Sequence, residues 1–152
     1  DYTTLAYLAG IIDGEGTFLL LYKSKLKQNW WDFSIRISNT NLQLHKWLRD
    51  NFNLSTSTPR QIKPNHKPCA VTYISAKNID ILLPQLLPYL VIKKNQGDLF
   101  IKARKLLKEK TKHPGYYKLM VQIREELTSQ NRRGDTKFIN SNSFDGFDTP
   151  EG

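Results

Sequence analysis

The chain has 152 residues, of which 39% are hydrophobic and 24% are charged, a composition that suits one globular domain and leaves little room for a second. Lys and Arg number 23 against 14 Asp and Glu, and the formal charge of +9 favours a polyanionic partner such as nucleic acid, although an unrelated basic enzyme would show the same excess. The single cysteine, Cys69, excludes an intramolecular disulfide and a cysteine-based zinc site, and no apolar run is long enough to span a membrane, so we expect no membrane partner.

The first third of the chain predicts a helix followed by a strand pair. Residues 3–14 are expected to form a short apolar helix that Thr3 or Thr4 caps and that ends near Gly14. Apolar and polar residues then alternate over residues 17–27 and 30–38, which is typical of antiparallel strands with one buried face. The apolar face comprises Phe18, Leu20, Tyr22, Trp31, Phe33, Ile35 and Ile37.

The remaining elements follow in the order helix, strand pair and helices. We expect a helix over residues 41–52, strands over 55–62 and 67–75, and helices over 79–87, 94–110 and 116–128. Pro84 and Pro88 are expected to limit the first of these last three helices. Residues 1–130 therefore form the predicted domain, and the Asn-, Ser-, Gly- and Asp-rich residues 131–152 form a predicted flexible tail.

This order predicts an α+β fold in which a four-stranded antiparallel sheet has helices on one face. The uncovered face is then polar and basic, which suits the major groove of DNA because a β-ribbon fits that groove. An ordinary solvated face would show the same pattern. The candidate DNA contacts on this face are Lys23, Lys25, Lys27, Trp30, Asp32, Ser34, Arg36 and Arg60.

The most specific motif runs from Leu8 to Gly16 with the sequence LAGIIDGEG. Within it and just before it, small residues recur at every fourth position and form a ridge that another helix can approach closely. The motif resembles the signature of the LAGLIDADG homing endonucleases. An isolated Asp-Gly-Glu-Gly would instead be a helix-ending turn with solvated acids. The candidate dimer-interface residues are Ala6, Ala9, Gly10, Asp13 and Gly14.

The resemblance extends over residues 4–110 and implies an αββαββα fold. It also includes residues 87–96, a Pro-aromatic-Leu segment that leads to a Lys- and Gln-rich helix start. Family members with one motif are homodimers, so the single motif here implies a homodimer. Two copies of the motif helix about a two-fold axis would bring two Glu15 carboxylates together, and a divalent cation would relieve their repulsion.

Site residues are implied by the same resemblance. Glu15 matches the metal-binding acid, Gly14 the residue that lends a backbone carbonyl to the metal, and Lys93 a basic residue near the scissile phosphate. Asn39 occupies a position where related dimers have Gln, and Gln43 a position where some have Arg. Both would order the water network of catalysis. Asp13 is expected to have a structural role at the helix end.

The implied function is that of an intron-homing DNA endonuclease. Such an enzyme cuts both strands of a long pseudo-palindromic site with Mg²⁺ and leaves short 3′ overhangs. Mn²⁺ is expected to substitute, and Ca²⁺ to bind without supporting cleavage. We expect an intracellular protein, in the chloroplast or mitochondrion of a eukaryote or in the cytoplasm of an archaeon or bacterium.

Two alternatives remain at this point. The first is an RNA-binding intron maturase, or a DNA-binding protein of the same fold, that does not cleave. The second is a nuclease of another class, which the scattered positions of His45, His66 and His113 disfavour. Later basic residues are either phosphate contacts or solvated helix faces. These are Lys102, Arg104, Lys105, Lys108, Lys110 and Lys112.

Overall fold

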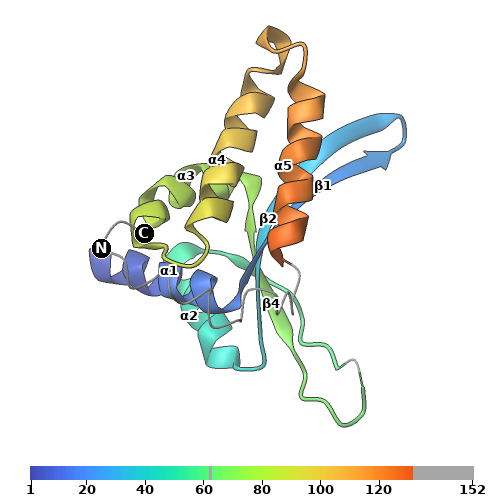
Figure 1. The fold of residues 1–152 in the computed structure, drawn as a ribbon. Coiled ribbons are helices and arrows are strands. Elements are labelled where there is room, and N and C mark those ends of the chain that lie inside the picture. Colours follow the sequence, from blue (N-terminus) through green and yellow to red (C-terminus); the bar gives the residue numbers. More distant parts are fainter. Residues whose placement is uncertain (62, 132–152) are drawn as a thin grey trace, which may run out of the picture.

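The computed structural model describes residues 1–61 and 63–131 (Figure 1). Of the tail predicted over residues 131–152, residues 132–152 lie outside the described residues, whereas Asn131 is the last residue of a helix. The elements in chain order are α1 (Tyr2–Glu15), β1 (Gly16–Lys25), β2 (Gln28–Asn39), α2 (Leu42–Phe52), β3 (Ser55–Thr56), β4 (Ala70–Ser75), α3 (Ala76–Leu86), η1 (Leu87–Tyr89), α4 (Lys94–Lys108), η2 (Lys110–Lys112) and α5 (Tyr116–Asn131).

The strands form one antiparallel sheet in the order β1-β2-β4-β3, which confirms the predicted α+β fold. The predicted alternation of β1 and β2 is also confirmed, since the register pairs Phe18 with Ile35 and Leu20 with Phe33 on the buried face. Figure 1 shows α4 and α5 side by side along the β1–β2 hairpin, where Phe100 of α4 packs edge-on against Phe18 and Phe33. The burial of these large apolar side chains joins the helices to the sheet.

The motif helix α1 begins at Tyr2, earlier than a cap at Thr3 or Thr4 would allow. The carboxylate of Asp1 accepts hydrogen bonds from the backbone N–H groups of Thr3 (2.7 Å) and Thr4 (3.2 Å), so Asp1 is the N-cap rather than Thr3 or Thr4. An acidic side chain suits this place because it satisfies free N–H groups at the positive end of the helix dipole.

The turn between β1 and β2 corrects the predicted strand. Leu26 and Lys27 both have positive φ, 49° and 67°, and form a two-residue hairpin turn. Such turns favour Gly and Asn, and neither occurs here, so the composition does not reveal this turn. Lys27 therefore lies at the hairpin tip and not on the strand face that the alternation assigned to it.

The second strand pair is also shorter than predicted. β3 has only two residues, and the hairpin continues beyond it as a Ser57–Val71 backbone hydrogen bond (2.8 Å) and an isolated bridge between Arg60 and Cys69. Three prolines in this hairpin lack the N–H that a continuous ladder requires. They are Pro59, Pro64 and Pro68. Pro84, in contrast, lies inside α3 and does not end it.

Candidate active site and nucleic-acid interface

The candidate active site begins where α1 passes directly into β1. Gly16 is the C-cap of α1, and its backbone N–H donates to the carbonyl of Ile12. A Cβ at Gly16 would lie 2.7 Å from that carbonyl oxygen, so a side chain at this position would force the backbone apart. The abrupt change from helix to strand leaves Glu15, the last residue of α1, with an exposed carboxylate.

Asp13 fixes the segment that leads into α4. Its carboxylate accepts hydrogen bonds from the backbone N–H groups of Val91 (2.9 Å), Ile92 (3.2 Å) and Lys93 (2.9 Å). Lys93 is the N-cap residue of α4, so one carboxylate joins the end of α1 to the start of α4. The expected structural role of Asp13 is confirmed by these contacts.

Lys93 brings its amine back to the same end of α1. Its Nζ donates to the carbonyl of Ile12 at 3.0 Å and also to the carbonyl of Gly16. Burial lowers the pKa of Lys93 below its ordinary value of 10.5, and the carboxylates of Asp13 and Glu15 oppose that shift. The contacts hold a cationic amine next to the Glu15 carboxylate.

An open pocket of about 240 Å³ collects most of the predicted site. Its lining residues are Gly14, Glu15, Gly16, Thr17, Lys93, Gln96, Gln130 and Asn131. The structure therefore brings together Gly14, Glu15 and Lys93, which the sequence resemblance had grouped. Three amide side chains from α4 and α5 complete the wall.

None of these three amides was among the predicted site residues, and two of them are hydrogen-bonded to each other. The Asn131 Nδ2 donates to the carbonyl of Phe18 at 2.7 Å, and the buried Gln96 donates to the Asn131 Oδ1 at 3.3 Å. This chain of bonds fastens the end of α5 to β1 beside the pocket. The only signal in the sequence was the helical spacing of Met120, Ile123 and Leu127, which carries α5 as far as this point.

Asn39 and Gln43 are not among the residues that line this pocket. The Asn39 side chain accepts the backbone N–H of Asn41 at 2.7 Å, and its carbonyl bonds to the Nε2 of His45 at 2.9 Å. Gln43 is exposed on the first turn of α2. Both residues lie at the junction of β2 and α2, and their role in a water network stays a prediction.

The donor set suits a hydrated divalent cation rather than a closed protein cage. In residues 1–61 and 63–131 no group of three or more His, Cys, Asp and Glu side chains could hold a metal ion together. Asp13 is occupied by three N–H groups, which leaves the Glu15 carboxylate and the exposed backbone of Gly14. Mg²⁺ retains several waters and needs only one or two carboxylates, so the Glu15 carboxylate and the Gly14 backbone fit it.

The exposed side of α1 carries a stripe of small residues beside the exposed Tyr2 and Tyr7. Ala6, Gly10 and Gly14 are exposed along one stripe, and a Cβ added at Gly10 or Gly14 would meet no atom within 4 Å. Ala9 does not belong to this stripe. It is fully buried in the core of its own chain, because it faces the sheet, and this removes it from the predicted interface.

The uncovered face of the sheet carries the predicted DNA contacts in two groups. Near the hairpin tip, Lys23 forms an ion pair with Asp32 at 2.8 Å. In the middle of the sheet, the Arg36 guanidinium lies over the ring of Tyr73, 5.5 Å from its centroid. Ser34 lies between them but is only 8% exposed. The other candidates, all exposed, are Lys25 at the end of β1, Lys27 in the turn, Trp30 opposite Lys23 and Arg60 in the proline-rich hairpin.

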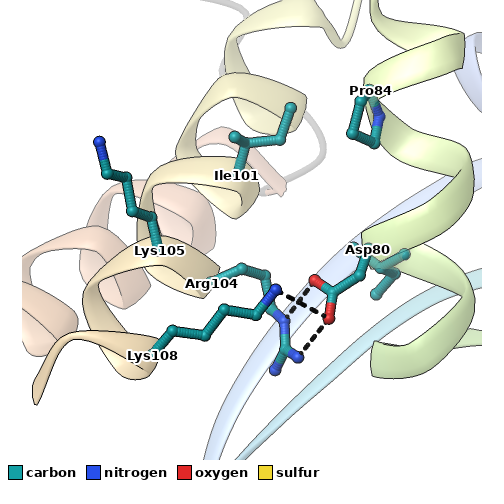
Figure 2. A pocket seen from close by; sticks show the side chains of 7 residues that line it. Asp80, Pro84, Ile101, Arg104, Lys105 and Lys108 are labelled. Atoms are coloured by element: carbon teal, nitrogen blue, oxygen red, sulfur yellow. Dashed lines mark hydrogen bonds and ion pairs between the residues drawn. The ribbon is translucent and has the colours of Figure 1, made fainter.

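The basic residues of α4 divide between packing and solvent. Arg104 donates two hydrogen bonds to Asp80 of α3, at 2.9 and 2.7 Å, and Lys108 lies 3.5 Å from the same carboxylate (Figure 2). The Arg104 guanidinium also lies 4.9 Å from the ring centroid of Phe33. The hydrogen bond from Arg104 holds the pKa of Asp80 below its ordinary value. Arg104 thus joins α3, α4 and the sheet, whereas Lys102 and Lys105 are exposed.

In the described part of the chain, every helix is too short or too polar to cross a membrane.

Comparison with known proteins gives structural matches only. No family model matches the sequence, and no curated protein matches it either. The archaeal intron-encoded homing endonuclease I-Vdi141I, solved in complex with DNA, matches with a TM-score of 0.70 and 18% identity, over 87% of this chain and 86% of that one. The homing endonuclease I-CvuI, in complex with its target in the presence of Ca, matches with a TM-score of 0.69 and 20% identity, over 89% and 86% of the two chains.

A longer protein matches over part of its length. The LAGLIDADG meganuclease I-AabMI, bound to uncleaved DNA, has a TM-score of 0.66 and 20% identity, over 89% of this chain and 47% of that one. The present chain thus corresponds to nearly all of the first two proteins and to about half of the third. It has the fold of the homing endonucleases, including those that bear the LAGLIDADG name.

Proposed function

We propose that the protein is a homodimeric, divalent-metal-dependent DNA endonuclease that cuts both strands of a long pseudo-palindromic site. The observation that carries this proposal is the pairing of an exposed Glu15 carboxylate with the part-buried amine of Lys93 in one pocket at the end of α1. A fold shared with DNA-bound homing endonucleases supports the choice of substrate.

The chain's own residues have separate tasks in this proposal. Glu15 and the Gly14 backbone would hold Mg²⁺, which would supply Lewis-acid stabilisation of the reacting phosphate. Two backbone carbonyls orient the Lys93 amine, which stabilises negative charge that develops on the scissile phosphate. Asp13 keeps Lys93 in place through the three hydrogen bonds to residues 91–93.

The proposed dimer rests on the single carboxylate and on the small-residue stripe of α1. Two copies of the Ala6, Gly10 and Gly14 stripe can approach closely about a two-fold axis, because a self-complementary surface is what such an interface requires. This packing brings the two pockets together and lets each Glu15 contribute to a shared metal site. One pocket then acts on each DNA strand, which accounts for double-strand cleavage with short 3′ overhangs.

The uncovered sheet face supplies recognition. β1 has ten residues, which at roughly 3.3 Å per residue extend about 33 Å, or on the order of nine or ten base-pair steps. Two subunits would therefore contact a site of roughly twice that length with two-fold symmetry.

The test is cleavage of a randomised duplex library in Mg²⁺ by the full chain, by Glu15→Gln and by Glu125→Gln. Glu125 is an exposed acid on α5 and serves as the matched control. We expect the full chain and Glu125→Gln to cut one near-palindromic site, and Glu15→Gln to bind that site without cutting it.

The opposite result is also informative. If the full chain binds DNA or RNA but cuts nothing in Mg²⁺ or Mn²⁺, the nuclease proposal fails and a binding function as a maturase or regulator replaces it. Equal cutting by Glu15→Gln would leave a nuclease but remove Glu15 from its site.

A further inference from the structure

Arg36 differs from the other basic residues of the uncovered face in how firmly it is placed. Its guanidinium lies over the Tyr73 ring, and its Nε is buried without a hydrogen-bond partner among the described residues. Lys23, by contrast, is neutralised by Asp32 at 2.8 Å. Within the described part, no acidic side chain forms an ion pair with Arg36.

A stacked arginine loses little side-chain freedom when it binds, and its planar fork of donors remains available. That fork matches the O6 and N7 acceptors of guanine in the major groove, whereas the amine of Lys is a point charge without a fixed plane. The cation–π contact with Tyr73 holds the guanidinium over the ring before DNA arrives.

The sheet register determines where along the DNA this contact falls. Arg36 is paired with Thr17, two residues after Glu15, and with Tyr73 on its other side. Lys23 lies six residues farther along β1 than Thr17, a separation of about 20 Å or roughly six base-pair steps. Arg36 is therefore next to the cleavage pocket, and Lys23 is near the outer end of the half-site.

We propose that Arg36 is a specificity-determining residue that recognises one guanine in the inner part of each DNA half-site. This inference rests on the proposed function, because it assumes that the uncovered face lies in the major groove. Tyr73 is the positioning residue for the guanidinium, and the recognised guanine lies about six base pairs nearer the centre of the site than any base contacted by Lys23.

The experiment is selection of binding sites from a randomised duplex library by the full chain with Ca²⁺ in place of Mg²⁺. Arg36→Gln is compared with Arg49→Gln, which changes an exposed arginine on α2. We expect the full chain and Arg49→Gln to select an inner guanine in each half-site. Arg36→Gln should prefer adenine there, because Gln pairs with the N6 and N7 groups of adenine, and should leave the other positions unchanged.

The strength of the preference for guanine tests whether Tyr73 positions the Arg36 guanidinium. Replacing the guanine should weaken binding of the full chain by about 5- to 150-fold, the range for one bidentate contact. Tyr73→Phe should keep this discrimination, and Tyr73→Leu should reduce it without moving the preferred position. Thermal unfolding of each variant shows whether the fold is intact, and Arg36→Lys supplies a second variant that keeps the charge but not the fork.

The outcomes separate the two proposals. If the full chain selects a two-fold symmetric site but Arg36→Gln and Arg36→Lys select the same bases, the assignment to Arg36 is overturned while the proposed function stands. If the full chain selects no DNA site at all, both are overturned.

Discussion

The carboxylate of Asp13 and the backbone N–H of Lys93 form a hydrogen bond of 2.9 Å across 80 positions of the chain. The Lys93 side chain then returns to the carbonyl of Ile12, the residue before Asp13. The two residues therefore close a loop of contacts around the end of α1, and the position of the amine depends on a carboxylate that is not itself free to bind metal.

Replacing Asp13 by Asn should lower both the stability of the fold and the rate of DNA cleavage. The amide has one acceptor oxygen for three N–H groups, so the free energy of unfolding should fall by about 1–3 kcal/mol. DNA cleavage should fall further than stability explains, because Lys93 is released. Urea unfolding and single-turnover cleavage measure the two effects. Asp98→Asn, on the exposed side of α4, should change stability by no more than about 1 kcal/mol and leave cleavage intact.

Lys93→Met should change how the free energy of unfolding depends on pH. Because the pKa of Lys93 is lowered by burial, the unfolded chain binds more protons than the folded chain between that lowered pKa and the ordinary 10.5. The stability that Lys93 contributes is therefore complete above pH 10.5 and decreases as pH falls through the folded pKa. We expect the unfolding free energy of the unchanged chain, relative to Lys93→Met, to rise with pH across this window. A difference independent of pH would contradict the burial of the amine.

The two kinds of glycine in the motif should respond oppositely to alanine. Gly16→Ala places a Cβ 2.7 Å from the Ile12 carbonyl and should cost on the order of 2–4 kcal/mol of stability. Gly10→Ala meets no atom of the chain, so it should raise helix stability by about 0.5–1 kcal/mol. Gly10→Leu should instead reduce dimer formation in sedimentation equilibrium. An unchanged monomer–dimer equilibrium for Gly10→Leu would argue against the α1 interface.

Asp80→Asn should weaken the contact between α3 and α4 and change the response to acid. The two hydrogen bonds from Arg104 are lost or weakened, at a cost on the order of 1–2 kcal/mol at neutral pH given the partial exposure of the pair. Because the Asp80 pKa is lowered, its contribution is complete above pH 3.8 and is lost as pH falls through the folded pKa. Unfolding measured from pH 5 downward should therefore show a steeper acid loss for the unchanged chain than for Asp80→Asn.

The β1–β2 pair could be predicted from sequence because alternation is a direct consequence of strand geometry. Phe18 and Phe33 reveal the buried face at a period of two, whatever the rest of the chain does. The turn at Leu26 and Lys27 could not be predicted, since neither residue type favours positive φ. In the same way, the sequence shows the prolines near β3, but it does not show how far the hydrogen bonds between the two strands continue past them.

The candidate site was only partly within reach of the sequence. Glu15 stood out because it lies in the motif, and Lys93 because of the family resemblance. In contrast, Asn131 bonds to Gln96 over 35 positions and to Phe18 over 113 positions, and no local pattern encodes such contacts. His45 shows the same limit. It lies buried between Thr72 and the Asn39 carbonyl, although an isolated histidine on a helix indicates a surface position.

The bond between Asn131 and the Phe18 carbonyl also orders events during synthesis. The N-terminal region leaves the ribosome with Glu15 and the first strand complete, while the residue that fastens α5 to that strand follows 113 positions later. Contacts so distant in sequence form only after the intervening chain has closed its loops. A nascent or truncated chain therefore presents the motif helix without an assembled pocket, and the proposed cleavage requires a chain translated at least as far as α5.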